Sequence, residues 1–263
     1  MIANPTIEVL MNRKSVRKFT NRKLTRDELE AIVRAGQQAP FASQLYSVLY
    51  STEGSIAYDA PVWFVVCVDT YKLERFMKLR GWSIVTNDLT LLLLGMQDAA
   101  YMAQNMVIAA ESLGIGSCFL GAVSSSSTRI ETLRERFALP NRVLPMVELV
   151  MGYPDEDFPP RPRYPLAFTL FENRYPELSD EDVREAMKVM DDGYLRQEYY
   201  KRNGAKIELE DGRADRYTFD DYSWTEHISR KWGQWTQSPN ELLDALRECG
   251  FSLFKDSKET GHR

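Results

Sequence analysis

Five consecutive residues near the start of the chain combine positive charge with a hydroxyl group. The run Arg13-Lys14-Ser15-Val16-Arg17 holds three cations and one serine. In an extended segment alternate side chains project to the same side, so Arg13, Ser15 and Arg17 would share one face. Guanidinium groups and a hydroxyl suit a phosphate and its polar neighbours. A basic turn that faces water explains the same residues, because runs of charge are usually solvated.

A second group of arginines lies far along the chain, at Arg161-Pro162-Arg163. Its proline stiffens the backbone between two guanidinium groups. Two separated arginine groups in a chain of net charge -5 favour a phosphorylated ligand that both groups bind. Taken alone, this second group is also typical of a surface loop.

Two further segments could meet a planar heterocycle. Residues 114–121 include Gly114, Gly116 and Gly121, and glycine lets a ring approach the backbone closely. This segment follows a predicted helix and lacks the GxGxxG spacing, which disfavours a Rossmann site. Residues 39–44 supply Ser43 and the amide of Gln44 for the edge of a ring. Helix-capping glycines and an ordinary helix-ending loop are the alternative interpretations.

Histidine and cysteine are scarce. Cys67, Cys118 and Cys249 are widely spaced, and the two histidines are His227 and His262. This usage argues against a disulfide framework, a zinc site and a Ser-His-Asp catalyst, and it predicts reduced thiols in a cytoplasmic protein. Near His227, the spacing of Trp224, Trp232 and Trp235 favours a core or interface stripe on one helix face over a substrate cage.

The elements that would position these groups alternate between helix and strand, which indicates an α/β or α+β sandwich. Capping residues, buried apolar runs and terminal glycines or prolines define them. A capping box from Thr128 to Glu131 is expected to begin one helix, and the charged stretch 201–221 is expected to be a mobile surface excursion. The predicted helices begin at Thr25, near Asp88, at Thr128, at Ser179 and at Ser238, and the predicted strands cover 61–69, 118–121 and 143–151.

Composition supports a folded, soluble chain. Of its 263 residues, 44% are hydrophobic, 27% charged and 11% aromatic, which is close to average globular usage. The net charge of -5 argues against a protein that binds nucleic acid along a basic face. No signal-peptide pattern opens the sequence, and the longest apolar run, residues 89–96, is too short to span a bilayer. We therefore expect a cytoplasmic protein without a membrane anchor.

The order of these pieces resembles the flavin-dependent nitroreductase superfamily. The resemblance covers about residues 5 to 175, and the tail is similar to the oxygen-insensitive nitroreductases and NADPH-flavin reductases. The residues that carry it are Arg13 to Phe19, Ala39-Pro40 with Gln44, Asp59-Ala60-Pro61-Val62, Gln104-Asn105, Ala109 to Gly116, Gly152-Tyr153-Pro154, Arg161-Pro162-Arg163 and Glu172-Asn173-Arg174-Tyr175.

The resemblance implies an α+β fold, a three-layer sandwich with a mostly antiparallel central sheet flanked by helices. It further implies a homodimer with the long helix at the interface and two FMN sites shared between subunits. Residues 1–175 would form the FMN-binding core and 176–263 a helical extension. The partners would be a nicotinamide reductant and a small-molecule electron acceptor, with no nucleic acid and no membrane.

The resemblance also implies the roles of particular residues. Arg13, Lys14 and Ser15 would hold the FMN phosphate and ribityl chain, and Arg17 would lie near the N1/O2 edge of the pyrimidine. A further set would complete the site: Gln44 at the polar edge of the ring, the Gly121 amide near N5, and Arg161 and Arg163 on the phosphate. A cation near N1 would stabilise the anionic reduced flavin.

No catalytic side chain is then required. Hydride would pass from NADPH or NADH to the flavin, and nitroaromatics, quinones or flavins would collect the electrons in a ping-pong cycle. Arg202 and Lys206 are candidate contacts for the adenosine phosphate of NADPH. Phe41 and Glu53 depart from the family pattern, which keeps a specialised reductase or dehalogenase open. A flavin carrier or sensor without turnover and a binding module for another phosphorylated ligand are the remaining alternatives.

Overall fold

The computed structural model describes residues 2–236 and 238–253, so His262 lies outside the described residues. The chain divides into two compact units. The first unit contains residues 1–158 and 238–263, and the second contains residues 159–237. Among the described residues no helix is both long enough and apolar enough to cross a membrane.

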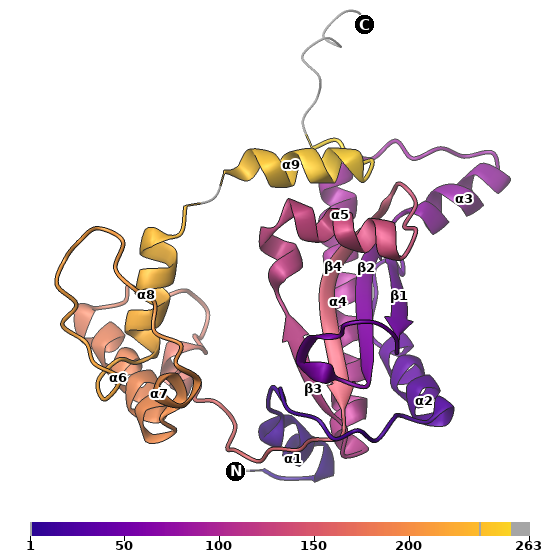
Figure 1. Cartoon of the computed structure of the whole chain (residues 1–263). Coiled ribbons are helices and arrows are strands. Elements are labelled where there is room, and N and C mark those ends of the chain that lie inside the picture. Colours follow the sequence, from indigo (N-terminus) through magenta and orange to yellow (C-terminus); the bar gives the residue numbers. More distant parts are fainter. Residues whose placement is uncertain (1, 237, 254–263) are drawn as a thin grey trace, which may run out of the picture. The chain divides into compact units, whose positions relative to one another are not determined.

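A four-stranded antiparallel sheet forms the centre of the first unit, in the order β1-β2-β4-β3 (Figure 1). The antiparallel sheet is accompanied by helices, so the predicted α+β fold class is confirmed. The strands are β1 (Tyr46–Ser51), β2 (Val62–Asp69), β3 (Gly116–Leu120) and β4 (Val143–Gly152). The helices of this unit are α1 (Pro5–Asn12), α2 (Arg26–Gln37), α3 (Tyr71–Leu79), α4 (Asp88–Ser112), α5 (Ser127–Arg136) and α9 (Pro239–Glu248).

The sheet is covered on both faces because alternate residues of β2 point to opposite sides. Val62 and Phe64 pack in a cluster with residues of α2 and α4. Trp63 and Val65 pack in a second cluster with residues of α5 and α9. All eight residues of β2 are buried, as the apolar run predicted. The first unit is therefore a three-layer sandwich.

Local sequence signals account for most helix ends. The Thr25 capping box begins α2, Asn87 caps α4, and Pro239 occupies the first turn of α9. The prediction of a capping box from Thr128 to Glu131 is wrong. Ser126 has an extended backbone and its side chain accepts the amide of Arg129, so α5 starts earlier, at Ser127.

The second unit is helical. Its helices are α6 (Asp180–Arg196), α7 (Tyr199–Asn203) and α8 (Trp224–Gln234), and the Ser179 capping box begins α6 as predicted. The charged stretch 201–221 includes the end of α7 and is tied to α8, because Arg230 pairs with Asp215 at 2.7 Å. Arg230 is 4% exposed, so this ion pair anchors the stretch on a buried side chain.

The division between units differs from the predicted boundary at residue 175. The first part of the first unit ends at residue 158, and the chain returns to this unit at residue 238. Helix α9 belongs with the sheet because Ala245 and Cys249 are buried in the cluster of α5 and β2, with Leu242 and Leu246 packed against it.

Candidate functional site

The basic segment after α1 is fastened to the edge of the sheet. Ser15 forms a bridge with Ser117 of β3, and the Val16 amide donates to the Ser117 carbonyl at 2.8 Å. Val16 is 1% exposed. The buried side chain of Val16, between Ser15 and Arg17, therefore helps to hold the segment in an extended form.

Three of the predicted ligands influence the pKa of one thiol in β3. Burial raises the pKa of the Cys118 thiol in β3, and Arg17, a hydrogen bond with Ser15 and Arg13 oppose that rise. The basic segment and Cys118 are thus electrostatically coupled.

Lys14 faces a different set of groups. Its Nζ lies 2.5 Å from Asp157 Oδ1, in the segment that follows β4. The same segment holds the backbone of the basic run, because Glu156 accepts the amides of Arg17 and Lys18 at 2.5 and 3.1 Å. The acidic residues after Pro154 therefore position the cations and neutralise part of their charge.

Glu111 is a residue near these cations that the sequence did not single out. It lies in the last turn of α4, and its Oε1 is buried without a hydrogen-bond partner in the described structure. Burial raises the pKa of the Glu111 carboxyl to about 7, although Arg13 and Lys14 oppose the rise. A buried carboxyl whose pKa is strongly raised is typical of functional sites.

The three glycines of the 114–121 segment have different structural roles. Gly114 follows α4 with φ of +73°, the left-handed conformation that commonly ends a helix. A β-carbon at Gly116 would collide with Val16, so this glycine lets the basic segment approach β3. Gly121, directly after β3, is exposed and has open space where a side chain would be. Of the three, only Gly116 is buried, and Gly121 combines an exposed backbone with a position directly after β3.

Gln44 lies in the loop between α2 and β1. It is exposed and has φ of +52°, a left-handed conformation that is unusual for a residue other than glycine. Phe41 in the same loop is 50% exposed. The loop amides donate to Asp98 of α4, another residue that the sequence did not single out.

The arginines of the second unit are held by α6 and the residues after it. The Arg161 guanidinium donates to Gln197 Oε1 at 2.5 Å and lies 4.0 Å from the centre of the Tyr199 ring. Gln197 in turn donates to the Pro160 carbonyl at 2.9 Å. Arg163 is exposed and donates only to carbonyls within its own loop. Arg161 is therefore fixed, whereas Arg163 can turn toward a ligand.

The two candidate nicotinamide-nucleotide contacts differ. Lys206 Nζ lies 2.7 Å from both Asp215 Oδ2 and the Tyr217 carbonyl, so its charge is already paired. Hydrogen bonds from Arg230 and, to a smaller extent, from Lys206 hold the pKa of Asp215 well below its usual range. Arg202 of α7 is exposed, and no ion pair of its side chain occurs among the described residues. Arg202 is thus the available cation of the pair.

The tryptophans do not form one stripe. Trp224 packs edge to face against Tyr164, whereas Trp232 and Trp235 stack on each other and are 66% and 44% exposed. His227 stacks on Tyr200, and burial lowers the pKa of its imidazole.

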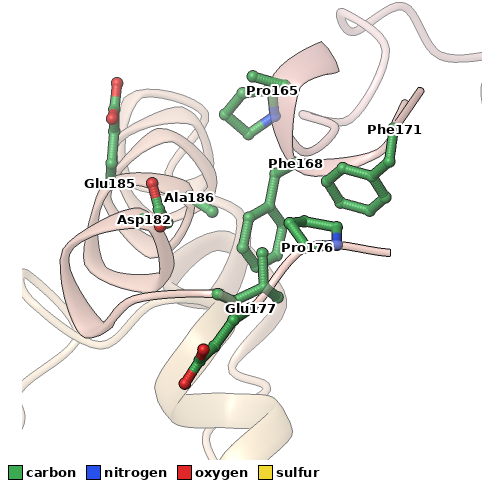
Figure 2. A pocket seen from close by; sticks show the side chains of 10 residues that line it. Pro165, Phe168, Phe171, Pro176, Glu177, Asp182, Glu185 and Ala186 are labelled. Carbon is green, nitrogen blue, oxygen red and sulfur yellow. The ribbon is translucent and has the colours of Figure 1, made fainter. Parts of the chain in front are cut away.

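A cavity of about 310 Å³ in the second unit is not the site predicted from the sequence. Phe168, Phe171, Pro165 and Pro176 form its apolar wall, while the carboxylates of nearby acidic residues extend away from the two rings (Figure 2). None of the predicted cofactor ligands lines it. An apolar pocket with carboxylates around it does not suit a phosphate.

The chain is similar to known proteins over most of its length. The model of the nitroreductase family matches residues 10–53 and 49–153, which together span more than half of the chain. The chain is 30% identical over 205 residues to an FMN reductase (NADPH) from Bacillus subtilis, covering 72% of this chain and 81% of that protein. It is also 30% identical to an oxygen-insensitive NADPH nitroreductase from Salmonella typhimurium, covering 86% and 90% of the two chains.

Solved structures show the same fold. A nitroreductase from B. subtilis superimposes with a TM-score of 0.76 at 27% identity, covering 94% of this chain and 98% of that one. The NADPH:FMN oxidoreductase of Vibrio harveyi superimposes with a TM-score of 0.73 at 25% identity, covering 94% and 99%. The match of the family model includes the basic segment, the Gln44 loop and Gly121. The chain belongs to the nitroreductase family.

Proposed function

We propose that this protein is an FMN-dependent NAD(P)H oxidoreductase that reduces nitroaromatics, quinones or flavins. The observation that carries the proposal is the attachment of the basic segment 13–17 to β3, through the Ser15–Ser117 bridge and the Val16 amide, with the exposed Gly121 directly after that strand. The names of the relatives, which are NADPH-dependent flavin reductases and nitroreductases, support the same activity. When bound, FMN accepts hydride from the reduced nicotinamide and returns two electrons to the acceptor.

The residues of the first unit fit this cofactor. Arg13, Lys14 and Ser15 bind the phosphate and ribityl chain, and Arg17 places positive charge beside the pyrimidine edge. Gln44 binds the polar edge of the ring. The exposed backbone of Gly121 supports the approach of the ring, because nothing occupies the space of its missing side chain.

Arg161 and Arg163 bind the phosphate, with Arg161 preset by Gln197 and Tyr199. Arg202 binds the adenosine phosphate of NADPH. Lys206 was a candidate for the same phosphate. Its ion pair with Asp215 favours instead a structural role, in which it holds residues 201–221 in place.

The proposal includes a homodimer in the cytoplasm. Leu89, Leu93 and Met96 of α4 are 51%, 54% and 47% exposed and recur at helical spacing. A row of exposed apolar side chains on an otherwise packed helix supports an interface with a second copy. Three free, buried cysteines are compatible with a reducing compartment.

The visible absorption spectrum tests the function directly. We expect purified protein, reconstituted with FMN where necessary, to be yellow and to bleach when NADPH is added under nitrogen. Colour that persists with NADPH and with NADH would indicate a flavin carrier instead of an enzyme. A protein that does not bind FMN at all would overturn the proposal. The double variant Arg13→Ala with Arg163→Ala should release the flavin, because each charge-assisted contact contributes about 1.5–3 kcal/mol.

A further inference from the structure

The loop that presents Gln44 has a backbone conformation that needs an explanation. Gln44 has φ of +52°, and a residue with a β-carbon reaches this region only at a cost in free energy. The residue is exposed, so packing of its own side chain does not impose the conformation. The restraint must come from the residues around it.

Asp98 supplies that restraint from the middle of α4. Its side chain accepts three backbone amides of the loop, from Ala42 at 2.6 Å, Ser43 at 3.1 Å and Leu45 at 2.9 Å. The donors lie on both sides of Gln44 in the sequence. Because they all converge on one carboxylate, the backbone between them has little freedom.

The Asp98 carboxylate is buried, and the loop amides are its hydrogen-bond donors. Asp98 is 1% exposed, and no cation lies within ion-pair distance of it in the described part of the chain. A buried charge without a cation is costly unless hydrogen bonds compensate it, and here the loop amides do so.

Gly95, one turn before Asp98, brings the helix close enough. A β-carbon at Gly95 would collide with Val68 and would lie 3.4 Å from the Cβ of Leu45. Residues three apart share a helix face, so the gap at Gly95 and the carboxylate of Asp98 face the same loop. Helix α4 therefore accommodates the loop at Gly95 and binds its amides at Asp98.

We propose that Asp98 is a positioning residue for the flavin site, which fixes the Gln44 loop in its binding conformation before the cofactor arrives. The inference rests on the proposed function. Asp98 would contribute to the affinity for FMN indirectly, by holding Gln44 in place. Asp98 itself is buried away from solvent.

A double-mutant cycle tests the inference. We expect Gln44→Ala and Asp98→Asn each to raise the Kd for FMN about tenfold. In the Asp98→Asn background, Gln44→Ala should change the Kd less than threefold, because the amide is no longer held in place. Asp69→Asn is the matched control, since Asp69 is another buried aspartate that accepts a backbone amide, from Lys72. In that background the full effect of Gln44→Ala should remain.

An equal effect of Gln44→Ala in both backgrounds would overturn the inference and leave the proposed function standing. If the unmutated protein does not bind FMN, the proposed function fails and the inference with it.

Amide hydrogen exchange of the unmutated protein gives a test that does not depend on the folding of a variant. The amides of Ala42, Ser43 and Leu45 should exchange slowly in FMN-free protein. Fast exchange that becomes slow only when FMN is added would show that the cofactor, and not Asp98, orders the loop.

Discussion

The ring of Pro162 lies against the backbone of Gly193 in α6, where a β-carbon would overlap two of its ring carbons. This contact sets the distance between the helix and the loop that carries Arg161 and Arg163. Gln197, one turn further, completes the restraint through Pro160 and Arg161. The arginine loop is thus shaped by the helix that follows it in the chain.

Replacing Gly193 by alanine should displace this loop. Alanine normally stabilises a helix interior by about 1 kcal/mol relative to glycine, but the overlap with Pro162 should reverse the sign and cost at least about 1 kcal/mol. The Kd for FMN, measured by fluorescence titration, should rise several-fold. Gly233→Ala in α8 is the control, because that position has open space. Equal behaviour of the two variants would refute the role of the contact.

The pKa of Glu111 predicts how stability changes with pH. Its folded-state pKa is raised to about 7 from an ordinary value of 4.5, so between these limits the folded protein binds more protons than the unfolded chain. The contribution of this group to stability is therefore present at pH 4–5 and is lost as pH rises toward 7. Glu111→Gln should remove this loss, with a gain over the unmutated protein of about 1–2 kcal/mol at pH 8 after screening by solvent.

Urea unfolding of FMN-free protein at several pH values measures this difference. The free energies of unfolding of the two proteins should converge toward pH 5 and separate toward pH 8. A difference that stays constant over this range would show that Glu111 does not titrate there.

Substitutions of Arg202 and Lys206 should affect different properties, nucleotide binding in the first case and stability in the second. Arg202→Ala should raise the KM for NADPH about tenfold and leave the KM for NADH unchanged, because NADH lacks the extra phosphate. Lys206→Ala should instead lower the melting temperature, since it leaves Asp215 with fewer partners. Steady-state kinetics with both nucleotides and thermal unfolding distinguish the two. A parallel change in both KM values would contradict the assignment of Arg202.

The exposed row on α4 predicts the oligomeric state. Leu93→Lys should convert a dimer to a monomer in light scattering, because it places a charge in the middle of the apolar row. FMN should be lost at the same time if the sites are shared. Leu79→Lys in α3 is the control, since Leu79 is 84% exposed and belongs to a different helix. A dimer that survives Leu93→Lys would move the interface elsewhere.

The sequence by itself determined the elements that local signals specify. The capping residues Thr25 and Ser179, the apolar run of β2 and the long helix α4 were predictable because each depends on neighbours in the chain. The basic segment was also visible, since its charge and alternation are local properties. Helix α5 shows the limit, because several hydroxyl residues competed for its cap and backbone conformation selected Ser126.

Only the tertiary structure decided the surroundings of buried polar groups. Asp98 and Glu111 are ordinary acidic residues in the sequence, and they acquire their roles from a loop 53 to 56 positions away and from cations near the start of the chain. The pairing of Lys206 and the return of α9 to the sheet are of the same kind. Burial and electrostatic environment depend on residues that are distant in the chain, so no local pattern could reveal them.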